Sequence, residues 1–230
     1  MQSLVLVPGL LCDERLWSHQ IRYLAEVAYC VVPDVSTADS IIGLAESVLA
    51  QAPPTFALAG LSMGGIIAHA IMALAPERVE RLALISTTAR ADTPEQTGRR
   101  QRLIEMTEQG RFAEVTPLLL PALLHSTRQD DATLTTPLLS MATRIGPATF
   151  LRHVHAIIGR PDRRAQLAAY AVPTLVLVGR EDAVTTLEMH EEMAQAIPHA
   201  RLAIIEECGH ISTLERPHAV TALMRLWLTG

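Results

Sequence analysis

The residues best suited to do chemistry are a serine and the glycines on either side of it. The sequence Gly60-x-Ser62-x-Gly64 follows an apolar run and precedes a helix-like segment that begins near Ile66. A serine on so tight a strand-to-helix turn is held in a strained conformation that exposes its hydroxyl. The N–H groups that open the helix then lie beside it and favour a developing anion. The pattern predicts a nucleophilic Ser62, although an ordinary tight turn between a strand and a helix can use the same small residues.

A serine hydroxyl is a poor nucleophile near neutral pH unless an imidazole accepts its proton and a carboxylate orients that imidazole. In folds that place the serine on such a strand-to-helix turn, the partners follow along the chain in the order serine, acid, histidine. Two strand-like runs downstream of Ser62 end at Asp182 and at His210. We therefore predict a catalytic set of Ser62, Asp182 and His210.

Other residues compete for these roles. Glu181 is the main rival of Asp182, and the pair Glu206-Glu207 is a weaker one. Position at the end of the strand favours Asp182, with Glu181 as a solvated turn residue. A structural role is the alternative for His210, but Gly209 frees the backbone where the ring must turn toward the serine.

The remaining histidines are expected to serve structural or surface roles. His69 is expected to pack inside the helix after Ser62, whereas four others are expected to be solvated: His19, His190, His199 and His218. Six residues of the segment 89–167 are candidates to face a pocket, with a surface role as the alternative for each: His125, His153, His155, Arg128, Arg144 and Arg152.

The elements that position these residues alternate between strand and helix, which indicates a parallel sheet. The strands are apolar on both faces and must lie between two layers of helices. The expected strands are 3–8, 29–33, 55–61, 81–86, 174–178 and 201–205, and the expected helices 15–27, 40–51, 63–75, 186–196 and 217–228. We predict an α/β fold with a mostly parallel sheet of about six strands.

The alternation stops over residues 89–167, where only helical segments interrupted by prolines occur. An insertion of this size between two strands is expected to form a helical cap above the serine, on a core of residues 1–88 and 168–230. Such a cap would exclude water and shape the pocket. Its many aliphatic residues favour a short or medium acyl group.

Composition excludes several other classes of protein. The net charge is −5 without runs of like charge, so neither nucleic acid nor an anionic membrane surface is expected as a partner. Three cysteines without metal-ligand spacing predict no metal site and fit a reducing compartment. No nucleotide-binding glycine motif occurs, so no cofactor is expected. The apolar start, residues 4–12, lacks the positive charge of an export signal, and we expect a cytoplasmic protein.

Three motifs together resemble the α/β-hydrolase superfamily: the turn at Ser62, Gly-x-x-Asp at residues 179–182, and Gly209-His210 followed by Glu215-Arg216-Pro217. The resemblance covers nearly the whole chain and extends to small capped members such as enol-lactonases, carrier-protein methyl esterases and a menaquinone-pathway synthase. It implies a three-layer fold. This chain departs from most relatives by lacking two initial strands and by carrying Pro8-Gly9 where they have His-Gly.

The resemblance also implies where an oxyanion would bind. In this fold one N–H comes from the residue after the nucleophile, here Met63, and a second from the loop after the first strand. Matching the motif gives Leu10 as the second donor. The alternatives are that Leu10 is an ordinary core residue or that Gly9 directs Leu11 inward.

These features predict a serine hydrolase that cleaves a small carboxylic ester, thioester or lactone through an acyl-enzyme on Ser62. The expected partner is therefore a small-molecule substrate, while the sequence carries no signal for the oligomeric state. Two alternatives stay open. A lyase or synthase would use the same three residues as a base, and a silent binding protein would keep only the fold. A lyase acting on a dicarboxylate would need two or more arginines converging on the pocket.

Overall fold

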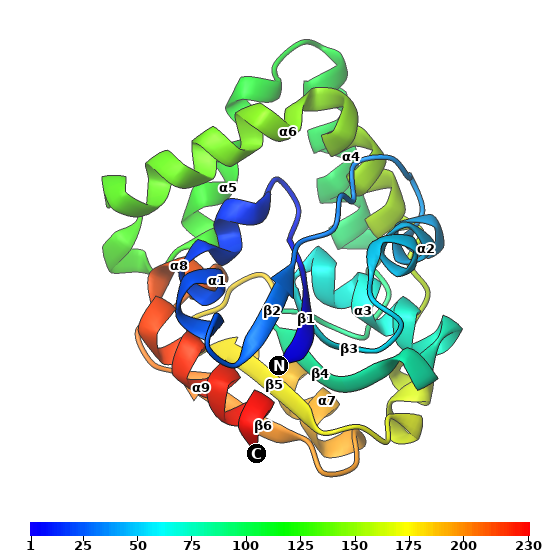
Figure 1. Ribbon diagram of the computed structural model, residues 1–230. Helices are drawn as coiled ribbons and strands as arrows, with labels where there is room; N and C mark the ends of the chain where they lie inside the picture. The colour runs from blue at the N-terminus through cyan, green and yellow to red at the C-terminus, as the bar shows by residue number, and fades with distance from the viewer.

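The computed structural model describes residues 1–230, and a six-stranded sheet forms its centre (Figure 1). Every neighbouring pair of strands is parallel, in the order β2-β1-β3-β4-β5-β6. The strands are β1 (Gln2–Val7), β2 (Ala28–Val31), β3 (Phe56–Leu61), β4 (Val79–Ile85), β5 (Thr174–Gly179) and β6 (Arg201–Ile205). This arrangement confirms the predicted α/β fold.

Alternating residues of each strand face two separate hydrophobic cores. In β1, Val5 and Val7 belong to one core, and Leu4 and Leu6 to the other. The first core packs against α2 (Ile41–Gln51), α3 (Met63–Leu74) and α7 (Leu187–Ala196), and the second against α1 (Ser18–Leu24) and α9 (Pro217–Thr229), which follows the short α8 (Ser212–Glu215). Both faces of the sheet are covered, as apolar parallel strands require. None of the helices combines the length and the apolar character that a membrane crossing needs.

The first expected helix, residues 15–27, is wrong in its bounds. A 3-10 turn, η1 (Glu14–Trp17), comes first, and α1 then ends at Leu24. Asp13 caps the 3-10 turn through its side chain, which accepts a hydrogen bond from the N–H of Arg15 at 3.0 Å. The helix must end early because the chain turns there to start β2 at Ala28. The other expected elements begin or end within two residues of the observed ones.

The segment between β4 and β5 contains helices and no strand. Its elements are, in chain order, α4 (Pro94–Glu108), α5 (Phe112–Leu123), the 3-10 turn η3 (Ser126–Arg128), α6 (Ala132–Ile158) and the 3-10 helix η4 (Arg164–Ala169). The prolines do not divide the helices as expected, because Pro117 and Pro121 lie inside α5. A real kink occurs in α6 at Gly146, which has a φ of 72°. The next residue, Pro147, begins a new helical run, a position that a proline tolerates well.

The helices of this segment have a small hydrophobic core of their own. It includes Leu103 of α4, Val115 of α5 and Phe150 of α6, and it also takes in Leu11 from the loop after β1. Figure 1 shows the three helices together at the top of the view, beyond the carboxyl end of β1. The segment therefore lies over the edge of the sheet where the side chains of a functional site gather in parallel α/β folds.

Candidate active site

Ser62 lies between the end of β3 and the start of α3, with an unusual backbone conformation. Its φ of 57° and ψ of −114° are strained for a residue with a side chain. The turn is held because Ser62 donates its N–H to the carbonyl of Ile85 in β4 at 3.0 Å. Its own carbonyl accepts the N–H groups of Gly65 and Ile66, which begin the helix. The conformation predicted for a nucleophile is present.

The neighbouring glycines are required by close contacts. A Cβ on Gly60 would overlap the carbonyl of Gly64, and a Cβ on Gly64 would overlap the carbonyl of Val7 in β1. Both obstacles are backbone atoms, which cannot move aside as a flexible side chain can. The spacing Gly60-x-Ser62-x-Gly64 therefore follows from how tightly the turn packs against β1 and α3.

Asp182 follows β5 and is almost fully buried, with 4% of its surface exposed. One oxygen, Oδ1, accepts the N–H groups of Val184 at 2.9 Å and Thr185 at 2.8 Å, and Oδ2 accepts the Thr185 hydroxyl at 2.8 Å. Burial alone would raise the pKa of Asp182, but the positive charge of a protonated His210 and these hydrogen bonds hold that pKa below its ordinary value. The carboxylate is thus fixed in place and ionised.

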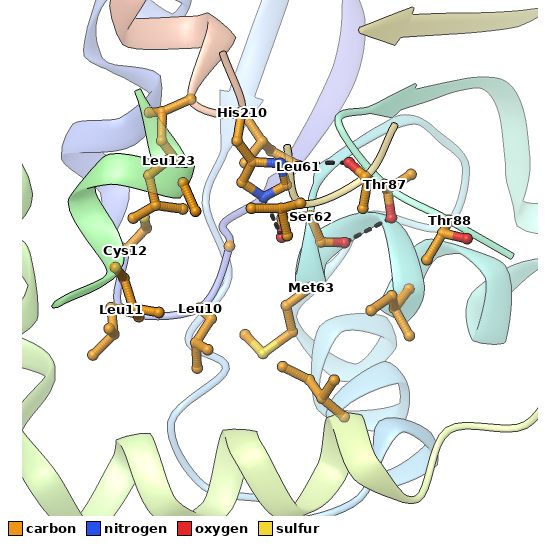
Figure 2. A pocket seen from close by; sticks show the side chains of 18 of the residues that line it. Leu10, Leu11, Cys12, Leu61, Ser62, Met63, Thr87, Thr88, Leu123 and His210 are labelled. Atoms are coloured by element: carbon orange, nitrogen blue, oxygen red, sulfur yellow. Dashed lines mark hydrogen bonds between the residues drawn. The ribbon is translucent and has the colours of Figure 1, made fainter. Parts of the chain in front are cut away.

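His210 lies in the loop after β6 and connects Asp182 to Ser62. Its Nδ1–H donates to Oδ2 of Asp182 at 2.8 Å, and its Nε2 accepts the Ser62 hydroxyl at 2.9 Å. The ring is buried, with 2% exposed. Figure 2 shows His210 directly above Ser62, with a dashed line joining the two. These distances are those of a proton path from the serine to an imidazole that a carboxylate orients.

The three rival carboxylates lie elsewhere. Glu181 accepts the N–H of Cys208 at 2.9 Å and so supports the loop that precedes His210. Glu206 and Glu207 form exposed ion pairs with Arg180 and Arg216. None of the three is bonded to His210, which leaves Asp182 as the carboxylate in contact with the imidazole.

Leu10 and Met63 both line the cavity that contains Ser62 (Figure 2). Neither N–H donates any of the turn, loop or cap hydrogen bonds of the backbone. Gly9 brings the loop close, because a Cβ there would lie 3.4 Å from the Cβ of Ser62. Leu11 also lines the cavity and has a φ of 62°, which marks a sharp bend of the loop beside Leu10. Unpaired N–H groups are therefore available next to the serine.

His190 was expected to be solvated, and this expectation is wrong. The ring is fully buried, since α7 packs it beneath the loop after β4. Its Nδ1–H donates to the carbonyl of Thr186 at 3.0 Å, and its Nε2 accepts the N–H of Thr87 at 3.0 Å. Thr87 in turn donates its hydroxyl to the carbonyl of Ser62 at 2.8 Å. His190 thus connects the chain after Asp182 with the turn at Ser62.

Glu215 connects His210 with the helical segment above the sheet. Its carboxylate accepts the N–H of His125, which follows α5, at 2.9 Å, and the N–H of Gly209 at 3.0 Å. Burial raises the pKa of Glu215, and the hydrogen bonds from His125 and Gly209 oppose this rise. Glu215, the first residue of the Glu-Arg-Pro motif, therefore holds the loop that carries His210 against the chain that follows α5.

None of the six residues offered as pocket-facing lines the cavity. His153 is buried but its Nε2 is bonded to the carbonyl of Val35, and Arg144 pairs with Asp13. Instead Arg99 and Arg100 of α4 and Arg160 line the cavity. The spacing of Gln96, Arg99, Arg100 and Leu103 indicates that they share one helical face, but it does not show that this face meets a cavity. His69 packs as expected, with its Nδ1 2.9 Å from the Tyr170 hydroxyl.

The cavity has a volume of about 340 Å³, near the lower end of the range for small-molecule sites. Its walls are mainly apolar, with Leu103, Leu119 and Leu123 contributed by α4 and α5. No group of three or more His, Cys, Asp or Glu side chains is arranged to hold a metal ion. The three cysteines are unpaired thiols. The space beside Ser62 therefore suits a small organic molecule.

Several solved structures are similar to this chain. A thermophilic esterase from Thermogutta terrifontis superposes with a TM-score of 0.89 at 28% identity, covering 99% of this chain and 89% of the other. An enol-lactonase from Burkholderia xenovorans superposes with a TM-score of 0.91 at 25% identity, covering 100% and 92%. The whole fold, including the helical segment between β4 and β5, thus has counterparts in structures with these names.

Sequence comparison agrees with the structural one. The pimeloyl-[acyl-carrier protein] methyl ester esterase of Nitrosomonas europaea is 30% identical over 187 residues, which cover 78% of this chain and 73% of that protein. The 3-oxoadipate enol-lactonase 2 of Acinetobacter baylyi is 29% identical over 182 residues, covering 75% of this chain and 64%, less than two thirds, of that protein. A family model described as alpha/beta hydrolase fold matches residues 51–217. The chain therefore belongs to the alpha/beta hydrolase fold family.

Proposed function

We propose that this protein is a serine hydrolase that cleaves a small carboxylic ester, thioester or lactone through an acyl-enzyme on Ser62. The observation that carries the proposal is the unbroken path from the Ser62 hydroxyl to His210 at 2.9 Å and from His210 to Asp182 at 2.8 Å. The names of the relatives, esterases and enol-lactonases, support ester bonds as the target.

The first half of the reaction forms the acyl-enzyme. Ser62 Oγ attacks the substrate carbonyl while its proton passes to Nε2 of His210, and Asp182 stabilises the resulting imidazolium. The N–H groups of Met63 and Leu10 stabilise the negative charge on the former carbonyl oxygen. When the tetrahedral intermediate collapses, the bond to the leaving oxygen or sulfur breaks, and His210 gives its proton to that atom.

The second half releases the acid. A water molecule gives a proton to His210 and attacks the acyl carbon, and the Ser62 oxygen leaves with the proton that His210 returns. With a lactone the leaving alcohol stays attached to the acyl part, so the product is a hydroxy acid. Residues 89–167 act as a cap in this proposal, since their helices supply part of the cavity wall over Ser62.

A fluorophosphonate probe tests the proposal. It should label the protein once, at Ser62, and Ser62→Ala should abolish both labelling and hydrolysis of p-nitrophenyl esters. Ser86→Ala is the matched control, because Ser86, like Ser62, follows a strand with a positive φ, 44°, but is buried and does not line the cavity. Stoichiometric label on any other serine, or ester hydrolysis that survives Ser62→Ala, would overturn the proposal.

A further inference from the structure

The charged side chains that line the cavity are all of one sign. Three arginines, Arg99, Arg100 and Arg160, belong to the lining, and no aspartate or glutamate does. This contrasts with the whole chain, whose net charge is −5. Arg99 is exposed, but the side chains of Arg100 and Arg160 are only 22% and 3% exposed, and a cation so far removed from water needs a structural partner or a ligand.

Part of the structural explanation is Asp92, which lies just before α4. Its Oδ1 pairs with Nη1 of Arg160 at 2.5 Å, and its Oδ2 accepts Nε–H of Arg100 at 2.8 Å. The side chains of Asp92 and Arg160 are 2% and 3% exposed, so this pair is buried. One carboxylate cannot balance three guanidinium groups, and the net charge of these four side chains is +3 − 1 = +2.

The remaining donors have no protein acceptor. Arg100 is bonded only through Nε, which leaves both of its Nη groups free, and Arg99 forms neither a hydrogen bond nor an ion pair. Glu95, one turn earlier on α4, forms no ion pair with Arg99, although the nearby charge of Arg99 contributes to lowering the pKa of Glu95. An unpaired guanidinium on a cavity wall offers the planar fork of donors that matches a carboxylate.

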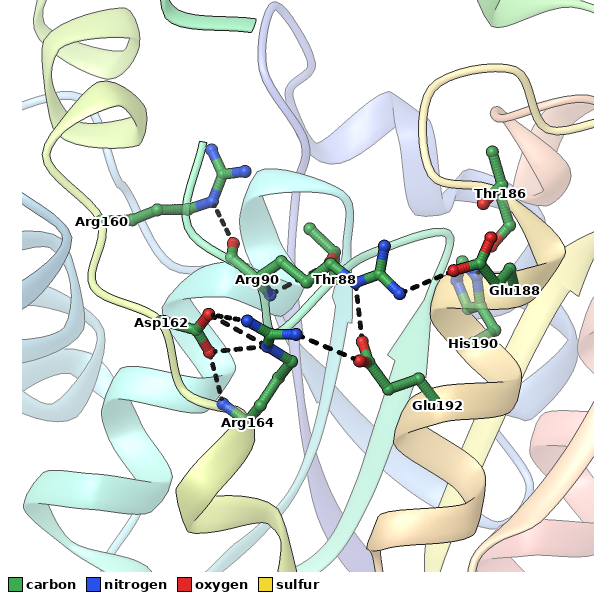
Figure 3. Close-up of polar contacts among 9 residues, drawn as sticks. All are labelled: Thr88, Arg90, Arg160, Asp162, Arg164, Thr186, Glu188, His190 and Glu192. Carbon is green, nitrogen blue, oxygen red and sulfur yellow. Dashed lines mark hydrogen bonds and ion pairs between the residues drawn. The ribbon is translucent and has the colours of Figure 1, made fainter. Parts of the chain in front are cut away.

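Arg160 is held in place by the chain around it. Its Nε–H donates to the carbonyl of Arg90 at 2.8 Å, and its Nη1 donates to the carbonyl of Ile157 at 3.2 Å. Figure 3 shows that Arg90 is in turn tied to α7, through ion pairs with Glu188 at 2.9 Å and Glu192 at 2.8 Å. The positive charge of Arg160 is therefore fixed beside the cavity and does not depend on a mobile side chain.

We propose that Arg99, Arg100 and Arg160 bind a carboxylate on the substrate while its ester carbonyl reacts at Ser62. This inference rests on the proposed hydrolase function and adds the substrate class: a small half-ester, or a lactone that carries a second, ionised carboxyl group. The cavity also has apolar lining residues, which suit a short aliphatic chain, and the volume of about 340 Å³ limits the size of that chain.

Two matched esters test the inference. Mono-p-nitrophenyl adipate and p-nitrophenyl hexanoate share a leaving group and chain length but differ in a terminal carboxylate against a methyl group. After subtraction of the rate with Ser62→Ala, the enzyme should have a kcat/KM at least about tenfold higher for the adipate ester, since charge-assisted hydrogen bonds to arginine are at stake.

The critical variant is Arg99→Gln, which removes the unpaired guanidinium without disturbing Asp92. It should lower the adipate-to-hexanoate ratio of kcat/KM about tenfold. Arg102→Gln is the control, because Arg102 is exposed on the same helix, as Arg99 is, but does not line the cavity, and it should leave the ratio unchanged. Circular dichroism and fluorophosphonate labelling confirm that each variant is folded and has a reactive serine.

The outcomes separate this inference from the proposed function. If Ser62 is labelled and both esters are cleaved, but the wild-type ratio is one or less, the carboxylate site is refuted while the hydrolase stands. Equal effects of Arg99→Gln and Arg102→Gln on the ratio would also refute it, because only long-range charge would then matter. Absence of both labelling and cleavage would refute the hydrolase, and the inference with it.

Discussion

The Nε2 atom of His190 accepts a hydrogen bond from the N–H of Thr87 at 3.0 Å. Because the opposite ring atom, Nδ1, donates to the carbonyl of Thr186, the buried ring must be neutral with its proton on Nδ1. A second proton on Nε2 would face an N–H donor and break the connection between α7 and the turn at Ser62. The fold therefore disfavours the charged form of this histidine.

Stability should consequently fall with acid through His190. Burial lowers the pKa of His190 from 6.5 to about 4. Between these two values the unfolded chain binds a proton that the folded chain does not, so the free energy of unfolding decreases as the pH falls, by up to about 3 kcal/mol. His190→Gln should reduce this slope between pH 6.5 and 4 in urea titrations, leaving the part that comes from His69 and His153, whose pKa values burial also lowers. His155 is exposed, and His155→Gln should keep the wild-type slope. A wild-type slope in His190→Gln would show that His190 does not cause the loss of stability in acid.

Glu215 should matter for both stability and reaction. In Glu215→Gln one carboxylate oxygen that accepts an N–H becomes an NH₂ group facing that N–H, which costs about 1–3 kcal/mol. We expect a lower melting temperature and slower labelling of Ser62, because the loop that carries His210 is loosened. Glu207→Gln changes an exposed acid of the same loop, and it should affect neither quantity.

Replacement of Asp182 tests the orientation of the imidazole. Asp182→Asn should lower kcat by ~10⁴ with little change in secondary structure, because the amide favours the wrong tautomer of His210. Glu181→Gln is the neighbouring control and should retain most activity, since its amide oxygen can still accept the N–H of Cys208. If the two variants behaved the other way round, Glu181 would be the acid.

Those parts of the fold that depend on local sequence were predictable. The strand before Ser62 and the one ending at Gly179 are continuous apolar runs, and the tight turn needs small residues at fixed positions. Element ends were less predictable where polar residues enter a strand, as Glu80 does near the start of β4. The sequence predicted interruptions at Pro117 and Pro121, but α5 continues through both residues, although a proline inside a helix removes one backbone hydrogen bond.

The residues of the site that directly follow strands were predictable from the sequence, and the residues that only packing brings to the site were not. Ser62, Asp182 and His210 each follow a strand, and the carboxyl ends of parallel strands meet at one edge of a sheet, so their proximity follows from topology. His190 was missed because its burial depends on how α7 packs against the loop after β4, for which a single sequence gives no pattern. Arg99 and Arg160 were missed because they approach the cavity from the two ends of the helical segment, and only its tertiary packing brings them together.

The same segment should set the length of the acyl group. Of the leucines available between β4 and β5, Leu119 of α5 lines the cavity, whereas its neighbour Leu118 is 59% exposed. Leu119→Ala should extend the cavity and move the preference toward longer p-nitrophenyl esters, by about fourfold in kcat/KM for each methylene that the new space buries. Leu118→Ala should keep the wild-type preference.

Labelling by a small fluorophosphonate separates two roles of Leu119. If the side chain only limits the space for the substrate, the labelling rate of Leu119→Ala should equal that of the wild type, because Ser62, His210 and Asp182 are held by β3, β5 and the loop after β6. A variant that kept its chain-length preference but lost labelling would show that α5 supports the reactive serine and histidine directly. The helical segment would then be part of the catalytic framework, and substrate choice would reside in the lining residues outside it, such as Leu10, Leu11 and Val184.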